Sequence, residues 1–103
     1  MLDKKVAIKT AHSFVEDCRK EGLNFHKVLI FGSVATNKAH EWSDIDLLLV
    51  SDQFNENLFD NIKLYSKINI RYPLIETHPY TTSYYLQGDE FINQISKNSI
   101  EIC

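Results

Sequence analysis

The chain has 103 residues and a formal net charge of −3 at pH 7, with 44% hydrophobic and 24% charged residues. This length fits one compact domain, so we expect residues 1–103 to form a single domain with one core. The acidic balance argues against strong binding to nucleic acid, which needs clustered lysine and arginine. No apolar run approaches the ~20 residues that span a membrane, and no signal-peptide core is visible, so we expect a cytoplasmic protein.

The first half of the chain predicts one helix followed by two strands. Apolar residues recur at helical spacing over residues 2–21, and Gly22 follows as a stop signal. The short β-branched and aromatic run 26–31 predicts a buried strand that ends at Gly32. Residues 43–50 predict a second strand, which is apolar on both faces after its first residues. We therefore place this strand in the centre of a sheet.

The second half predicts a helix, a strand and a final helix. Residues 57–69 carry apolar side chains at helical spacing, and residues 72–78 predict a third strand bounded by prolines. A closing helix is predicted up to Lys97, with Asp89 as its N-cap. The expected fold is α+β, with a small mixed β-sheet and helices packed on one face.

Two aspartates, Asp44 and Asp46, open the otherwise apolar second strand. Side chains two residues apart on a strand point the same way, so both carboxylates face one side. Such close like charges repel each other unless a cation or a hydrogen-bond donor offsets them. Mg²⁺ binds a few carboxylate oxygens together with phosphate oxygens and water. The pair therefore predicts an open site for a complex of metal and nucleotide.

Gly32 and Ser33, at the end of the preceding strand, predict a phosphate-binding turn. Glycine permits close approach of the backbone, and exposed N–H groups with a serine hydroxyl bind phosphate oxygens. Phosphate and metal sites would then lie side by side.

The ordered set Gly32-Ser33, then Ser43-Asp44-Ile45-Asp46-Leu47, resembles the nucleotidyltransferase superfamily related to DNA polymerase β. The signature of that superfamily is a Gly-Ser turn followed by Asp-x-Asp. The short chain is similar, more narrowly, to the minimal nucleotidyltransferases, the antitoxin-like partners of HEPN proteins. The resemblance is specific over residues 31–50 and extends more weakly to Tyr80, which is about half of the chain. It implies a polymerase β-like nucleotidyltransferase fold.

The resemblance implies a site for two Mg²⁺ ions and an NTP, expected to be ATP. Asp44 and Asp46 would hold Mg²⁺ on the triphosphate, and a third carboxylate from a neighbouring strand would hold the metal that activates the attacking hydroxyl. We assign this role to Glu76, although aspartate is commoner there in the superfamily. The expected site residues are Asp44, Asp46 and Glu76 for metal binding and catalysis, and Gly32, Ser33 and Ser43 for the nucleotide.

The chain departs from the minimal members directly after the Gly-Ser turn. Those members continue with x-Ala-Arg-Gly, whereas this chain has Thr36 and Asn37 in place of the arginine and the glycine. Loss of the arginine removes positive charge near the triphosphate, so we expect lower nucleotide affinity or turnover. Asparagine tolerates left-handed backbone geometry better than most residues, which makes the second change milder.

Three residue assignments keep alternatives open. Glu76 is also compatible with an ordinary ion-pair residue on an edge strand. His78 is read as a turn histidine before Pro79, with hydrogen-bond donation to the metal ligands as the alternative. Tyr80 and the neighbouring Tyr84 and Tyr85 are compatible with three roles: stacking on a nucleobase, forming a surface for a partner, or packing partly in the core and partly at the surface.

The leading function hypothesis is Mg²⁺-dependent transfer of a nucleotidyl group, expected to be AMP, to an acceptor hydroxyl. By resemblance, the acceptor is a tyrosine of a HEPN toxin, and the acceptor site comes from that partner or from a second copy of the chain. The alternative is an antitoxin-type binding module that neutralises a HEPN partner by direct contact without turnover. Transfer to a small molecule is a third hypothesis.

Overall fold

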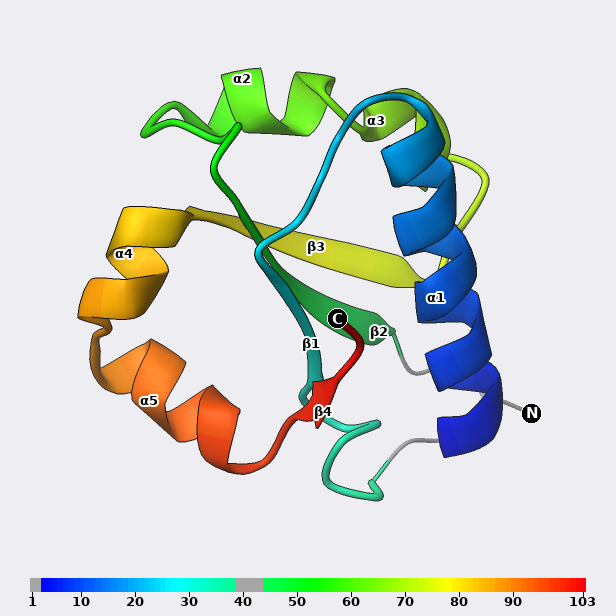
Figure 1. The fold of residues 1–103 in the computed structure, drawn as a ribbon. Helices are drawn as coiled ribbons and strands as arrows, with labels where there is room; N and C mark the ends of the chain where they lie inside the picture. Colours follow the sequence, from blue (N-terminus) through cyan, green and yellow to red (C-terminus); the bar gives the residue numbers. More distant parts are fainter. Residues whose placement is uncertain (1–2, 39–43) are drawn as a thin grey trace.

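The protein, described here by a computed structural model over residues 3–38 and 44–103, is built on a mixed sheet with strand order β3-β2-β1-β4 (Figure 1). β1 (Lys27–Phe31) pairs antiparallel with β2 (Ile45–Ser51) on one side and with β4 (Ile100–Glu101) on the other. β3 (Ile75–Thr81) runs parallel to β2. The predicted α+β class and mixed sheet are confirmed.

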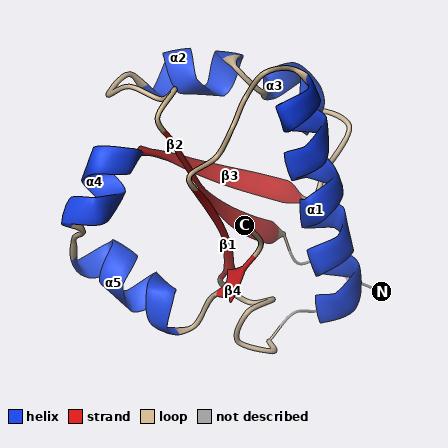
Figure 2. Cartoon of the chain, viewed as in Figure 1, coloured by secondary structure: helices blue, strands red, loops and turns tan. Residues whose placement is uncertain are grey.

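Helices lie on both sides of the sheet (Figure 2). They are α1 (Lys4–Lys20), α2 (Leu58–Lys63), α3 (Ser66–Asn69), α4 (Thr82–Gln87) and α5 (Glu90–Lys97). α1 and α3 share the larger core with one face of β2, whereas Tyr85 of α4 and Ile95 of α5 pack on the opposite face. The structure thus adds a second helical layer to the predicted one, because the apolar far face of the central strand also needs cover.

α1 forms where the helical spacing predicted it. Asp3 is its N-cap, and its side chain accepts a hydrogen bond from the Val6 N–H at 2.8 Å. The face toward the sheet is apolar and buried, and Phe14 at its centre makes edge-on contacts with Tyr65 and Tyr72. Gly22, with φ of +91°, ends the helix in a left-handed turn that glycine adopts without a steric penalty.

β2 is the central strand, as predicted from its composition. Ile45, Leu47 and Leu49 belong to the larger core, while Leu48 and Val50 belong to the smaller one on the other face. The alternation of a strand therefore puts Asp46 on the side of the smaller core, in line with Leu48. β1 and β3 flank this strand, so both of its edges are hydrogen-bonded.

The predicted helix over 57–69 is divided into α2 and α3. The break falls at Tyr65, which has a non-helical φ of −137° and is only 1% exposed. Its ring lies in the core, and its hydroxyl is 2.8 Å from the Thr77 hydroxyl of β3. Burial of this aromatic ring overrides the helical spacing around it.

The third strand begins and ends three residues later than predicted. The segment before it is a turn, in which the Ile75 N–H donates to the Tyr72 carbonyl at 3.0 Å. Pro79, expected to end the strand, lies inside β3 opposite Leu49. β3 is an edge strand, where a proline without an N–H is tolerated. The predicted strand ended at His78, so the shift places His78 inside β3 rather than at its end.

Two elements were not predicted from the sequence. α4 is a short helix capped by Thr81, whose side chain accepts from the Tyr84 N–H at 3.1 Å, and β4 is a two-residue strand. The last helix was predicted correctly with its cap, because Asp89 accepts a hydrogen bond from the Ile92 N–H at 2.8 Å. Within residues 3–38 and 44–103, no helix is long and apolar enough to cross a membrane.

Candidate functional site

The glycine of the Gly-Ser turn and the second aspartate of the acidic pair lie in contact. The antiparallel register of β1 and β2 pairs Phe31 with Asp46, so Gly32 follows directly beside the aspartate. Gly32 has φ of +75°, and a Cβ at this position would overlap the Asp46 carboxylate. Only glycine satisfies both the backbone conformation and the close approach. The two predicted halves of the site therefore meet.

The segment after Gly32 forms a series of hydrogen-bonded turns over residues 32–37. The Thr36 backbone N–H and its hydroxyl both donate to the Gly32 carbonyl at 3.1 Å. Asn37 adopts a left-handed φ of +61°. Asparagine therefore occupies a position that favours glycine, and threonine turns its hydroxyl back onto the turn.

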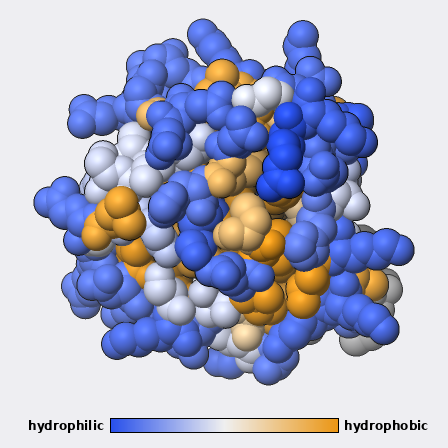
Figure 3. Space-filling view, viewed as in Figure 1, coloured by the Kyte–Doolittle hydropathy of each residue, from blue (hydrophilic) through white to orange (hydrophobic). Residues whose placement is uncertain are grey.

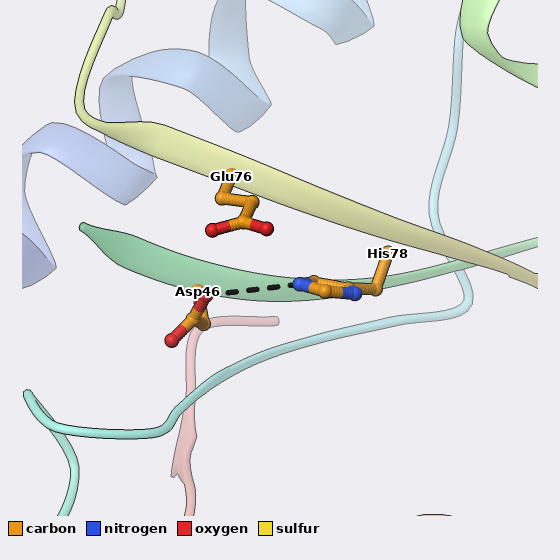
Figure 4. A group of neighbouring side chains, drawn as sticks. All are labelled: Asp46, Glu76 and His78. Atoms are coloured by element: carbon orange, nitrogen blue, oxygen red, sulfur yellow. Dashed lines mark ion pairs between the residues drawn. The ribbon is translucent and has the colours of Figure 1, made fainter.

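β3 brings Glu76 to the same place. The parallel register pairs Glu76 with Asp46, and His78 follows two residues later on the same side of the strand. Figure 4 shows all three side chains converging on the space in front of β2. One ligand atom from each of Asp46, Glu76 and His78 lies within 4.8 Å of the others. Two carboxylates and an imidazole are donors that divalent metal ions bind.

His78 is held beside Asp46 rather than in a turn, so the turn assignment from the sequence is wrong. Its Nε2 lies 3.7 Å from Asp46 Oδ1, and its ring meets that of Phe31 edge-on, with centroids 5.0 Å apart. At 3.7 Å the contact is an ion-pair distance and too long for a hydrogen bond. Nε2 is shielded from solvent and, among the residues that the structure describes, has no hydrogen-bond partner.

The electrostatics of Asp46 fit a cation at this site. Burial raises the pKa of the Asp46 carboxyl, and the nearby Asp44 charge adds to the effect, while the interactions with His78 and Glu76 oppose it. The charged form of Asp46 is therefore poorly compensated by its surroundings. A divalent ion would offset the two adjacent carboxylates and would satisfy the unpaired imidazole nitrogen.

The other predicted site residues are Asp44, Ser33 and Ser43. Asp44 is exposed just before β2 and does not belong to the group of Asp46, Glu76 and His78. Ser33 is half-buried in the turn, and Ser43 lies outside the described residues. His78 was missed as a site residue because its position directly before Pro79 favoured a turn. Its spacing of two from Glu76, within the predicted strand, nevertheless indicates a shared face.

A groove of about 390 Å³ adjoins the Gly32 turn and runs along α5. Its walls combine the aromatic, amide and basic side chains of Phe31, Phe91, Gln94, Lys97 and Asn98 with the backbone of Gly32. The Phe91 ring is 41% exposed and meets Phe31 edge-on, with centroids 5.9 Å apart. The groove thus offers a flat apolar surface and a positive charge next to the carboxylate cluster.

Comparisons with known proteins agree with this geometry. A solved structure of a candidate nucleotidyltransferase from Sulfolobus solfataricus superposes with a TM-score of 0.71 at 25% identity, covering 95% of this chain and 80% of that one. A solved toxin–antitoxin with AMP-PNP has a TM-score of 0.62 at 13% identity, covering 89% of this chain and 72% of that one, and so shares the fold. No curated protein matches the chain.

The family comparison covers nearly the whole chain. The sequence model of the nucleotidyltransferase domain matches residues 12–100, a span that includes the Gly32 turn, Asp46 and Glu76. The chain therefore belongs to the nucleotidyltransferase domain family.

Proposed function

We propose that this protein transfers a nucleotidyl group, AMP from ATP, to an acceptor hydroxyl with the help of Mg²⁺. The observation that carries the proposal is the position of Asp46, whose carboxylate lies between the Gly32 turn and Glu76 in a chain of the nucleotidyltransferase family. Residues 1–103 would act as one domain. A glycine turn that can bind phosphate oxygens, in contact with carboxylates that can bind cations, is the arrangement that transfer of a nucleotidyl group to a hydroxyl requires.

In this proposal the carboxylates hold the cations. Asp44 and Asp46 would bind Mg²⁺ together with the phosphates, and Glu76 would share with Asp46 the ion on the side of the acceptor. Bound Mg²⁺ supplies positive charge to the phosphate oxygens and lowers the pKa of the acceptor hydroxyl. The exposure of Asp44 at the entry to β2 suits a ligand that meets the nucleotide from solvent.

The Gly32 turn would orient the triphosphate. The absence of a side chain at Gly32 lets the backbone approach phosphate oxygens, and the hydroxyls of Ser33 and Ser43 would donate to them. The acceptor oxygen forms a bond to the α-phosphorus as the bond from that phosphorus to the bridging oxygen breaks, and pyrophosphate leaves. The proton of the acceptor hydroxyl passes to solvent.

The groove along α5 would receive the nucleoside and part of the phosphate chain. Phe91 presents an exposed ring on which a base can stack, and Gln94 offers an amide that donates and accepts at a base edge. Lys97, in the same groove, would supply a positive charge. This charge would compensate for the arginine that Thr36 replaces.

The acceptor is proposed to be a tyrosine of a HEPN-type toxin. The support is the shared fold with the toxin–antitoxin structure that contains AMP-PNP. A site for the acceptor would come from the partner or from a second copy of the chain. The carboxylate cluster is open on the side of Glu76, which is exposed.

The test is transfer of label from [α-³²P]ATP to a co-expressed HEPN-type partner, measured with Mg²⁺ and with EDTA. Labelling of the partner that depends on Mg²⁺ is expected, and it should disappear in the double variant Asp44→Ala, Asp46→Ala. Replacement of the exposed Asp52 by Asn serves as the control and should leave labelling unchanged. Undiminished transfer by the double variant would contradict the mechanism.

The second candidate function is an antitoxin that neutralises its partner by contact alone. It is favoured by Thr36, which occupies the position of the lost arginine and hydrogen-bonds back to Gly32. Hydrophobic side chains also reach the surface, and Figure 3 shows them gathered near the C-terminus on the face in view. Neutralisation that persists with EDTA and without both aspartates would support this function over transfer.

A further inference from the structure

The cluster of Asp46, Glu76 and His78 differs from an all-carboxylate site in having one nitrogen donor. His78 Nε2 lies 3.7 Å from Asp46 Oδ1, which is too far for a hydrogen bond. It is shielded from solvent and unpaired among the described residues. Buried polar atoms are nearly always satisfied, so an unpaired nitrogen aimed at two carboxylates indicates a missing ligand.

Three features keep this nitrogen directed at the carboxylates. β3 carries Glu76 and His78 two residues apart, so both side chains leave the strand on the same face. The parallel register places Glu76 beside Asp46. The Phe31 ring packs edge-on against the imidazole from β1, with centroids 5.0 Å apart. Figure 4 shows the resulting convergence.

The spacing suits one shared ion. Metal–ligand bonds of about 2.1 Å place two ligands of one ion no more than about 4.2 Å apart. The three donor atoms already lie within 4.8 Å of one another. The distance of 3.7 Å between His78 Nε2 and Asp46 Oδ1 is already inside this range, and the exposed side chain of Glu76 is free to turn toward the same ion.

We infer that His78 is a metal ligand, and that the position formed by Asp46, Glu76 and His78 prefers a first-row transition ion such as Mn²⁺ over Mg²⁺. The inference rests on the proposed function, in which this position is the acceptor side of the site. Mg²⁺ takes oxygen ligands and gives up water reluctantly, whereas transition ions accept imidazole nitrogen. The nucleotide side, with Asp44 and the phosphates, keeps the oxygen ligands that Mg²⁺ prefers.

The experiment is pulsed electron paramagnetic resonance of Mn²⁺ added to the wild-type protein before any nucleotide. Hyperfine coupling to a histidine nitrogen is expected, and it should change when histidine alone is labelled with ¹⁵N. The coupling should be lost in His78→Gln and kept in His12→Gln, which removes an exposed histidine of α1. Because the labelled wild type gives the answer by itself, the test does not depend on the folding of a variant.

Calorimetry supplies the second readout. The ratio of Mn²⁺ to Mg²⁺ affinity should fall by roughly 10–100-fold in His78→Gln, the range typical when a residue that supports a metal site is removed. His78→Asp, which restores an oxygen donor, should also lower the ratio.

The result that overturns the inference is Mn²⁺ that fails to bind, or that binds without histidine coupling. Addition of AMP-PNP then separates this failure from failure of the proposed function. Phosphorus coupling to Mn²⁺ in the ternary complex would show that the nucleotide site works with oxygen ligands alone. If phosphorus coupling were also missing, the proposed function would fail with the inference.

Discussion

The Asp46 carboxylate lies against Gly32 so closely that a Cβ at position 32 would stand 3.3 Å from Asp46 Cγ and would overlap the carboxylate oxygen. This contact joins the end of β1 to the start of β2, and it places the turn and the acidic cluster in one site. The position of the carboxylate toward Glu76 and His78 therefore depends on the missing side chain of Gly32.

Gly32→Ala is expected to disable the site as well as to strain the backbone. The added methyl group displaces Asp46, so nucleotide binding with Mg²⁺ should fall below detection by calorimetry. Gly22→Ala is the matched control, because Gly22 also has positive φ but has open space where a Cβ would stand. The control should lose about 1 kcal/mol of unfolding free energy and keep nucleotide binding. Equal binding by both variants would contradict this account of Gly32.

Glu76→Gln is expected to separate nucleotide binding from transfer. The change removes a charge from the acceptor side of the cluster while Asp44 and Asp46 remain. Transfer should fall on the order of 100-fold or more, and the Kd for AMP-PNP should change only a few-fold. Glu56→Gln, an exposed glutamate outside the cluster, is the control. A Glu76 variant with wild-type transfer would return Glu76 to the role of an ordinary edge-strand residue.

Lys97→Gln tests the groove along α5. If Lys97 supplies the charge that Thr36 lacks, its loss should weaken AMP-PNP binding by about tenfold at low salt and by less at high salt, because the side chain is exposed. Lys67→Gln, at an exposed position of α3, should leave the affinity unchanged. The measurement is calorimetry at two ionic strengths. Identical affinities of the two variants for AMP-PNP would show that the groove along α5 does not bind the nucleotide.

Cys18 predicts a loss of stability at alkaline pH. Burial, with a smaller effect from the Asp17 charge, raises the pKa of the Cys18 thiol from 9.0 to about 12. The unfolded chain loses this proton from pH 9 upward while the folded chain keeps it, so the unfolding free energy falls as pH rises from 9 toward 12.

The fall contributed by this thiol is at most about 1.4 kcal/mol per pH unit. Urea unfolding at pH 8, 9 and 10 measures it, and Cys18→Ala should show a shallower decline than wild type. The buried thiol should also resist alkylation at pH 8 in the folded protein. Parallel pH profiles for the two proteins would show that Cys18 does not ionise on unfolding in this range.

Sequence patterns predicted most of what positions the site. The spacing of apolar residues was sufficient to predict α1 and β2, and the two apolar faces of β2 indicated a central strand. The capping residue Asp89 was sufficient to predict where α5 begins. The register that sets Glu76 beside Asp46 was not available from the sequence, because strand pairing depends on contacts between distant segments. The Gly-Ser turn and the acidic pair were found because their residue types carry chemistry that a core does not need.

The predictions that failed did so where tertiary packing overrides local preference. Tyr65 breaks the helix over 57–69 because its ring belongs to the core. Pro79 lies within β3 because an edge strand tolerates it, and the expected turn before this proline led to the wrong assignment of His78. The roles assigned to the predicted site residues in metal binding, nucleotide binding and catalysis stay predictions.

The most direct test of the central claim is calorimetric titration of AMP-PNP into the wild-type protein and into Asp46→Asn, with Mg²⁺ and with EDTA. Asp46→Asn preserves the shape of the side chain beside Gly32 and removes its charge. Binding that requires Mg²⁺ and is lost in Asp46→Asn, but not in the control Asp52→Asn, is the predicted result. Binding of equal strength in wild type and Asp46→Asn, or no binding in either, would contradict the nucleotidyl-transfer site described here.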